Sequence, residues 1–502
     1  MSESRSTPAY PSIVGTETEF GIIIRGVEDM DYASYCLLLV NSFPERLDGE
    51  RIWDYDLETP MVDARGFKAK GFISVPSKKD NMAINNILSN GARYYVDHAH
   101  PEYSTPECGN VREVLCYEKA GERIVELSRR MAGAALPAGR EIIIYKNNSD
   151  QKGNSYGYHE NYLMTRRVPF SILADKLIPF LVTRQIFCGA GKVGSENGRD
   201  EVPFQVSQRA DFFETEVGLE TMAKRPIVNT RDEPHADNTK YRRLHVITGD
   251  ANMSEYTTYL KVGTLSIVAE MIDEGFLETP CVLRASVDAM TRVSHDPDLR
   301  GTIELDDGKK VRAVDVQRMY LEAAHRYYAD REMSPIAKDV LAKWEFVLDA
   351  LETDFWRLER YVDWVAKRRI LREYAERKGP KWHDPKIRMM DLQYHDSRPE
   401  RSLYALLERQ GRMERILTDG EIEQAMREPP PSTRAYFRGA CLRKFPENVA
   451  GVNWDSISFR VGEGPIKRVM MKEPGRGTRH HVQALLDSVE TVEELIEKLS
   501  SL

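Results

Sequence analysis

Residues 12–25 read SIVGTETEFGIIIR, and the alternation of their side chains followed by a β-branched run predicts a β-strand. Glu17 and Glu19 are two residues apart in this stretch, so in a strand both carboxylates point to one face. Two neighbouring carboxylates repel each other unless a cation lies between them. The pair therefore indicates a candidate cation site. A solvated strand face carrying two acids is the commoner outcome for such a pair taken alone.

A second strand is predicted at residues 91–98 (GARYYVDH), and it repeats the pattern. Three of its side chains share one face by the same period of two, namely Arg93, Tyr95 and Asp97. Directly after them come His98, His100 and Glu102. Unpaired buried charge is costly, so a cluster of this composition is poor material for a core. It favours a functional site, and the alternative is a polar edge strand or a structural ion-pair network.

Three further stretches carry groups that a metal or phosphate site needs. Residues 145–163 (YKNNSDQKGNSYGYHENYL) predict a loop suited to bringing backbone amides near a ligand, followed by a strand with His159. Arg209 lies in a predicted strand at 203–213. Residues 229–255 gather Arg231, His235, Arg242, Arg243 and His245. The alternatives are a flexible surface loop, an isolated surface arginine and a solvated, charge-rich turn.

These side chains offer two kinds of chemistry. Glutamate, tyrosine and histidine supply hard ligands for Mg²⁺ or Mn²⁺, and arginine supplies paired donors for phosphate or carboxylate oxygens. Metal and arginine together are typical of phosphoryl transfer. The sequence has no G-x-x-x-x-G-K-[ST] loop, no dinucleotide-binding fingerprint and no kinase motif set, and GAGKVG at 189–194 lacks the required spacing. We therefore expect any nucleotide to bind on a sheet through metal ions.

The composition excludes several classes of protein. The chain has 502 residues, and 71 Lys and Arg against 79 Asp and Glu give a net charge of -8, without a long basic block. This argues against a general nucleic-acid or membrane binder. The six cysteines form no C-x-x-C pair, the first residues lack the apolar core of a signal peptide, and no apolar run approaches a membrane span. We expect a cytoplasmic protein.

The order of the predicted elements favours an α+β fold over alternating βαβ units. Further strands are predicted at 141–147, 159–165, 226–231, 242–248 and 452–461, and helices at 112–133, 256–274, 311–330, 335–353, 355–378 and 481–500. A long polar stretch at about 41–81 is interpreted as an inserted loop, either functional or mobile. The prolines at 429–431 mark a boundary, which predicts a catalytic domain at 1–428 and a small C-terminal domain at 432–502.

The chain resembles the Pup ligase and Pup deamidase/depupylase family, within the glutamine synthetase-like carboxylate–amine ligase superfamily. Pup is the prokaryotic ubiquitin-like protein. The resemblance begins near Ile13 and covers essentially the whole chain. Its longest blocks are GTETEFG, YVDHAHPEYSTPEC, YKNNSDQKGNSYGYHENYL, NTRDEPHADNTKYRRLHVITGDANMSE, TRAYFRGACLRKF and NWDS. The short DHAHPEY pattern, ADFFETEVGLET and the segment WDYDLETPMVDARGF are similar to the depupylase branch.

The resemblance implies a glutamine synthetase-like curved antiparallel sheet that cradles ATP and Mg²⁺, with helices behind it and a small C-terminal domain. It implies that Asp97 is the catalytic residue. The implied metal ligands are Glu17, Tyr95 and Glu102, and the implied ATP contacts are Arg93, Thr105 and Trp454. By position on the same sheet we add Glu19, His159 and His245 as metal candidates. As binders of phosphate or of the substrate carboxylate we add Arg209, Arg231 and Arg243.

The activity that the resemblance implies is hydrolysis of the side-chain amide at the C-terminal residue of Pup. Pup ending in glutamine would become Pup ending in glutamate, and pupylated proteins would be released at the substrate lysine. ATP would serve as a bound cofactor, and the partners would be Pup and pupylated proteins, with a functional link to a bacterial proteasome. The nucleophile is either Asp97 or a phosphate derived from ATP. The alternatives are a Pup–protein ligase, which would phosphorylate the glutamate of Pup, and an inert ATP- or Pup-binding adaptor.

Overall fold

A six-stranded sheet lies at the centre of the computed structural model, which describes residues 13–27, 31–47, 49–70, 75–379 and 381–501. Every pair of neighbouring strands in it is antiparallel. In spatial order the strands are β15 (Tyr241–Val246), β10 (Tyr158–Thr165), β1 (Val14–Glu19), β8 (His100–Ser104), β7 (Arg93–Asp97) and β6 (Asn85–Ile87). This sheet, with helices packed behind it, confirms the predicted α+β class.

The predicted strand at 12–25 is two strands in the structure. β1 ends at Glu19, and β2 (Gly21–Arg25) pairs instead with β9 (Glu141–Tyr145) in a separate two-stranded sheet. The side chain of Phe20, at the break, is buried, and its backbone N–H donates to the carbonyl of Pro101 (2.9 Å). The chain therefore leaves the central sheet directly after the second acid.

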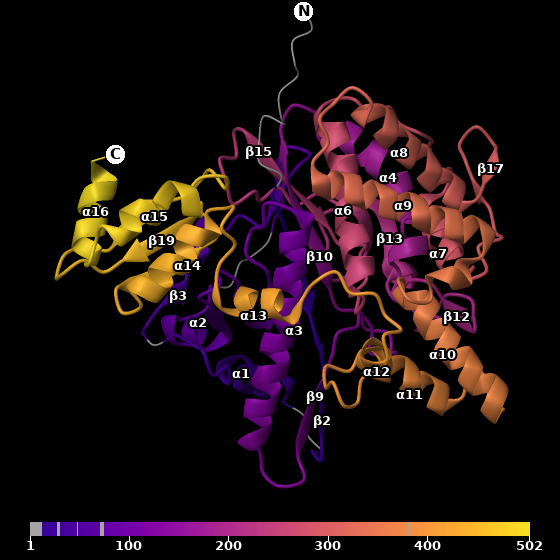
Figure 1. The fold of residues 1–502 in the computed structure, drawn as a ribbon, viewed down its shortest axis with the longest axis horizontal. Coiled ribbons are helices and arrows are strands. Elements are labelled where there is room, and N and C mark those ends of the chain that lie inside the picture. Colours follow the sequence, from indigo (N-terminus) through magenta and orange to yellow (C-terminus); the bar gives the residue numbers. More distant parts are fainter. Residues whose placement is uncertain (1–12, 28–30, 48, 71–74, 380, 502) are drawn as a thin grey trace, which may run out of the picture.

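Two long helices cover the face of the sheet opposite the acids. They are α3 (Val111–Ala134) and α6 (Glu255–Asp273), close to the predicted 112–133 and 256–274 (Figure 1). Glu118 of α3 accepts hydrogen bonds from Thr16 (3.1 Å) and Tyr158 (2.7 Å), and from the buried Lys146 (2.6 Å). Fully satisfied buried polar networks hold one arrangement of a core. This network fixes β1 and β10 from behind.

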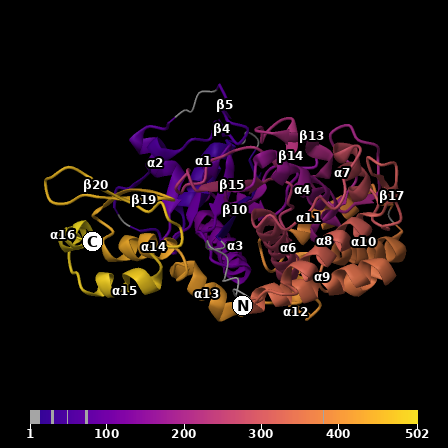
Figure 2. The same ribbon diagram turned by 90° about the horizontal axis from the view of Figure 1, so that it is seen from above.

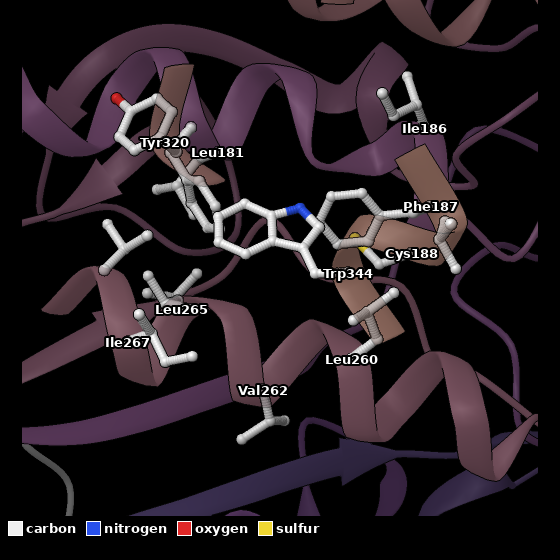
Figure 3. Close-up of a cluster of buried hydrophobic side chains, with 14 of the residues drawn as sticks. Leu181, Ile186, Phe187, Cys188, Leu260, Val262, Leu265, Ile267, Tyr320 and Trp344 are labelled. Carbon is white, nitrogen blue, oxygen red and sulfur yellow. The ribbon is translucent and has the colours of Figure 1, made fainter. Parts of the chain in front are cut away.

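Most of the remaining helices form a bundle beside the sheet. Trp344 is fully buried at its centre, among apolar side chains such as Leu181, Phe187 and Leu260 (Figure 3). The bundle includes α4 (Phe170–Thr183), α5 (Gln185–Cys188), α7 (Ser286–Ser294), α8 (Ala313–Tyr328), α9 (Pro335–Thr353), α10 (Asp363–Lys378), α11 (Pro385–Tyr394) and α12 (Leu403–Arg409). Among the described residues, no helix is both long enough and apolar enough to cross a membrane.

Two predicted elements are wrong in detail. The strand at 203–213 is reduced to β12 (Phe204–Gln205), because the backbone of Gln208 and the hydroxyl of Ser207 donate to the buried Asp250 (both 2.8 Å) rather than to a strand. The helix at 355–378 begins at residue 363, because the carbonyl of Tyr361 accepts from Ser254 and Thr257 outside any helix.

The C-terminal region packs around a hydrophobic cluster of its own. Its sheet has four strands in the described chain: β20 (Lys467–Met470), β19 (Ser456–Phe459), β18 (Val449–Asn453) and β3 (Ile52–Trp53). It also contains α14 (Ala435–Lys444), α15 (Arg479–Asp487) and α16 (Val492–Ser500), which lie at one end of the molecule, while α13 (Asp419–Arg427) precedes them and packs on α3 (Figures 1 and 2). The predicted strand at 452–461 and helix at 481–500 are each divided in two by a turn.

The predicted insertion at 41–81 contributes β3, which pairs in parallel with β18. Its described part also holds the short hairpin of β4 (Val62–Asp63) and β5 (Phe67–Lys68) and the start of α2 (Lys78–Ile84) (Figure 2). Residues 48 and 71–74 of the insertion lie outside the described residues. The domain boundary at 428–432 stays a prediction.

Candidate active site

One face of the central sheet carries nearly all the polar groups expected from the sequence. Glu17 on β1 lies opposite His159 on β10 and Ser104 on β8, and Glu19 lies opposite Glu102. Residues directly opposite each other in a sheet point to the same face. By the same register, Glu102 lies opposite Tyr95, Ser104 opposite Arg93, and His245 opposite Asn161.

A first cluster joins Glu17, His159 and His245, whose ligand atoms all lie within 4.8 Å of one another. His159 Nδ1 is 3.1 Å from Glu17, and the amide of Asn161 donates to Glu17 (2.8 Å). Burial alone would raise the pKa of Glu17, but the hydrogen bond from His159 and the charge of Arg243 hold it well below its usual value. The first cluster therefore has an ionised carboxylate.

His245 completes the first cluster with a free nitrogen. Its Nδ1 is 2.8 Å from the side-chain oxygen of Asn161, while its buried Nε2 has no partner among the described residues. Burial, and then the charge of Arg243, lower the pKa of His245 well below its usual value, which keeps the imidazole neutral. A neutral imidazole with one nitrogen held and the other free is the form that binds metals.

A second cluster joins Glu19, Asp97 and Glu102, again within 4.8 Å. Burial and the charges of Asp97 and Glu19 raise the pKa of Glu102 well above its usual value. The backbone N–H of Gly157 donates to Glu19 (2.8 Å). Three acids in one place, one of them made hard to ionise by the others, form a site that a cation would stabilise.

The two clusters meet at Gly157. A Cβ atom on this residue would lie 2.6 Å from His159 Nε2 and 2.8 Å from a carboxylate oxygen of Glu19, closer than real Cβ atoms come. Asn148, from the preceding loop, is buried and accepts from the backbone of Ala251 (2.6 Å). The loop is therefore fixed on both sides of its exposed tip at 152–154, and it places a backbone amide at the site as expected.

Asp97 ends β7 at a tight hairpin turn. The two turn residues, His98 and Ala99, have φ angles of 43° and 65°, in the left-handed region that residues with a side chain seldom adopt. His98 Nδ1 is 2.7 Å from an Asp97 carboxylate oxygen, and this hydrogen bond raises the pKa of His98. The turn leaves Asp97 partly exposed at the edge of the second cluster, with 39% of its side chain accessible.

The three predicted anion-binding arginines surround the clusters. Arg243 lies 3.8 Å from Glu17 and 3.5 Å from Glu233. Arg231 is close enough to Arg243 for their charges to repel, and burial together with that repulsion lowers its pKa. Arg209 is buried beside β10 without an ion pair in the described chain, and burial lowers its pKa to about 10. All three guanidinium groups have a buried Nε–H without a partner in that part of the chain.

The predicted ATP contacts divide into two groups. Thr105 and Trp454 line a pocket that is partly open to solvent, and Glu17 also lines it. Arg93 does not line it. Its guanidinium packs on the rings of Tyr95 (3.8 Å) and Trp53 (4.2 Å), and Trp53 in turn contacts Trp454 edge to face. Arg93 therefore supports the wall of the pocket from behind.

The pocket also contains two polar residues that were not named as candidates, Asn161 and Arg434. His235, which also lines it, was grouped with Arg231, Arg243 and His245 but was assigned no role. Asn161 is two residues after His159 in the same predicted strand, so the period of two already indicated that it shares the face of His159. Arg434, next to α14, is ion-paired with Glu107 (2.7 Å), and only the folded chain brings these residues together.

Comparison with known proteins gives a consistent result. The model of the family described as "Pup-ligase protein" matches residues 12–458. The depupylase of Acidothermus cellulolyticus is 49% identical, and the Pup deamidase/depupylase of Mycolicibacterium smegmatis is 44% identical. Each of these two alignments covers 97% of this chain and 99% of the relative. A Pup–protein ligase of Actinosynnema mirum is 42% identical over 81% of this chain and 90% of the relative.

Among solved structures, the complex of Pup with its ligase PafA has a TM-score of 0.81 and 30% identity, covering 98% of this chain and 95% of that one. The Pup ligase PafA in complex with ADP has a TM-score of 0.73 and 33% identity, covering 84% of this chain and 96% of that one. Sequence, fold and site thus agree, and the chain belongs to the Pup-ligase family.

Proposed function

We propose that this protein hydrolyses the side-chain amide at the C-terminal residue of Pup. It converts Pup ending in glutamine into Pup ending in glutamate, and it releases Pup from the lysines of pupylated proteins. The observation that carries the proposal is the match, over 97% of this chain, to relatives named depupylase or Pup deamidase/depupylase. The relatives named ligase match a smaller share, 81%.

The second cluster offers the carboxylate oxygens that Mg²⁺ prefers, whereas the first offers one carboxylate and two imidazole nitrogens. We assign Glu17, His159 and His245 to one cation, since His245 has a buried, unpartnered nitrogen. We assign Glu19 and Glu102 to a second, with Tyr95 beside Glu102 on the next strand. When bound, the cations would neutralise the acids and hold phosphate oxygens near the amide.

The pocket lined by Glu17 is the proposed ATP site, and a relative in this family has been solved with ADP. Trp454 would supply an aromatic surface for the base, and Thr105 a hydroxyl. We assign Arg243 and Arg231 to the phosphates, because their unpartnered N–H groups are the charged donors beside the first cluster. Arg209 lies nearer Glu19 and suits the carboxylate or the oxyanion of the substrate.

Asp97 is the proposed nucleophile. Its carboxylate oxygen attacks the amide carbonyl carbon, the C–N bond breaks, and the leaving nitrogen takes up a proton from solvent and departs as the amine. A water molecule then opens the resulting anhydride between Asp97 and the Pup side chain, which restores the Asp97 carboxylate, gives glutamate and returns protons to solvent. ATP stays intact through this cycle, since no step needs a phosphoryl group.

Pup and pupylated proteins are the proposed partners, in a cytoplasmic setting linked to a bacterial proteasome. A solved relative holds Pup itself. In the described chain all six cysteines are free thiols, which agrees with a reducing compartment.

The deciding experiment incubates the protein with Pup ending in glutamine, ATP and Mg²⁺. We expect ammonia release without any acceptor protein and without loss of ATP. Conjugation of Pup ending in glutamate to a lysine, with ADP formed, would instead identify a ligase. Neither reaction, with nucleotide still bound, would identify an adaptor.

A further inference from the structure

His235 stands out in the pocket because of its backbone. Its φ angle is 45°, in the left-handed region that a residue with a Cβ seldom occupies. Such outliers persist where the surrounding structure over-determines them, and they concentrate at ligand sites.

The chain on both sides of His235 is tied down. The carboxylate of Glu233 accepts from the backbone of Thr59, in the inserted segment, and lies 3.5 Å from Arg243. The backbone N–H of Asp237 donates to the carbonyl of Lys472, in the C-terminal region (3.0 Å). Two distant parts of the chain, the inserted segment and the C-terminal region, therefore fix the position of His235.

The imidazole of His235 is nearly buried, and it faces the pocket. Its side chain is 11% exposed, and the nearest acid is Glu233, at 3.9 Å. Neither ring nitrogen makes a hydrogen bond within the described chain. Burial, followed by the charges of Arg243 and Arg434, lowers the pKa of His235 well below its usual value. The ring is therefore neutral, with one donor and one acceptor left for a ligand.

His235 lines the pocket together with Glu17 and Arg243, at the first cluster, and with Trp454 and Arg434, in the C-terminal region. The backbone carbonyl of Trp454 accepts from Arg438 of the Glu107–Arg434–Arg438 group. The charges of Arg243 and Glu17, and those of Arg434 and Glu107, all act on His235. In a nucleotide whose phosphates meet the metals and whose base meets Trp454, the group in between is the ribose.

We propose that His235 forms a hydrogen bond with a ribose hydroxyl of the bound nucleotide, so that the pocket selects ribonucleotides over deoxyribonucleotides. This inference rests on the proposed binding of ATP. A neutral imidazole suits a hydroxyl, which both donates and accepts, better than it suits a phosphate, for which Arg243 is available. Loss of the hydroxyl would leave a nearly buried nitrogen without a partner, which is how such sites reject an analogue.

The test is calorimetric titration of the whole protein with Mg²⁺ and ATP, 2′-deoxy-ATP or 3′-deoxy-ATP. We expect the wild type to bind one deoxy form about tenfold more weakly than ATP, as for one lost hydrogen bond to a buried group. In His235→Asn the new asparagine tolerates a positive φ, but its side chain is too short to reach the ligand. His235→Gln is a second variant. Both variants should bind ATP about tenfold more weakly than the wild type does. They should bind ATP and that deoxy form with equal affinity. His325→Asn, at an exposed histidine on α8, should behave like the wild type.

Two results would overturn the inference while leaving ATP binding intact. One is equal affinity of the wild type for ATP and both deoxy forms, a result that does not depend on any variant folding. The other is an undiminished preference for ATP in both His235 variants. Failure of the wild type to bind any of the three nucleotides would overturn the proposed ATP site itself.

Discussion

Glu17 and Glu19 lie on the same face of β1, two residues apart, yet their carboxylates belong to different clusters. Glu17 is grouped with His159 and His245, and Glu19 with Asp97 and Glu102. The rise of a strand places side chains i and i+2 nearly 7 Å apart, a spacing that suits two separate cation sites better than one cation held by both acids. In the proposed assignment, one strand separates the nucleotide side of the site from the substrate side.

Replacing Asp97 with asparagine removes the proposed nucleophile and keeps the shape of the side chain. We expect ammonia release from Pup ending in glutamine to fall by at least about a thousandfold, a loss typical of removing a nucleophile. ATP affinity should change less than threefold, because Asp97 does not line the nucleotide pocket. Asp175→Asn, at an exposed site on α4, is the control. Retention of activity in the Asp97 variant would exclude it as the nucleophile.

Gly157→Ala tests the close approach of the two clusters. The added methyl group would lie 2.6 Å from His159 Nε2 and 2.8 Å from Glu19, so one of these side chains must move. We expect Mg²⁺-dependent ATP binding to weaken at least about tenfold, which corresponds to about 1.4 kcal/mol. Gly133→Ala on α3 has open space around the new methyl group and should bind as the wild type does. Equal binding by both variants would contradict the assignment of these ligands.

Binding of Mg²⁺ should release a proton. Burial, followed by the charges of Asp97 and Glu19, raises the pKa of Glu102 well above its usual value, whereas a cation binds only the carboxylate. Mg²⁺ affinity should therefore rise with pH. Titration calorimetry in buffers of different ionisation enthalpy would measure the proton directly.

Two variants test which carboxyl group releases that proton. In Glu102→Gln the dependence on buffer should disappear. In Glu17→Gln the affinity should fall but the proton should remain, because Glu17 is already ionised. A wild type without any dependence on buffer would show that Glu102 is not protonated before the cation binds.

Glu107 should stabilise the protein against acid. Burial alone would raise its pKa, but the charges of Arg438 and Arg434 lower it to about 2, against a usual value of 4.5. A carboxyl group with a depressed pKa stabilises the fold fully above its unfolded-state pKa, and this stability is lost as the pH falls from about 4.5 to about 2. The shift corresponds to about 3 kcal/mol at neutral pH.

Glu107→Gln should therefore lower the free energy of unfolding by about 3 kcal/mol at pH 7 and by much less near pH 2. Urea unfolding across this range measures the difference. Glu463→Gln, at an exposed residue in the β19–β20 turn, should change little. A loss that is the same at every pH would mean that packing, rather than charge, gives Glu107 its effect.

The sequence was most informative where a strand has one buried face. The period of two correctly placed Glu17 with Glu19, and Arg93 with Tyr95 and Asp97, because a single residue of slip would have exposed the whole apolar face. β1 shows the expected alternation of buried and half-buried residues along its length. The predicted spans of the two long helices behind the sheet, 112–133 and 256–274, were also close to α3 and α6.

The periodicity of the side chains does not predict contacts between segments that are distant in the sequence. Nothing local predicts that Arg93 packs against Trp53 and so supports Trp454. The positive φ of His235 depends on anchors at Thr59 and Lys472, far away in the chain. The prediction of a strand at 203–213 failed for the same reason, because the buried Asp250, 42 residues after Gln208, accepts a hydrogen bond from the backbone of Gln208.

The parallel pairing of β3 with β18 has a consequence for synthesis of the protein. Trp53 leaves the ribosome early, but its partner Val452 follows about 400 residues later. At about 5–20 residues per second the edge of β3 stays unpaired for roughly 20–80 s. Trp53 is almost fully buried in the finished protein, so during this interval the nascent chain exposes an aromatic strand. That segment is where we expect a chaperone to bind the growing chain.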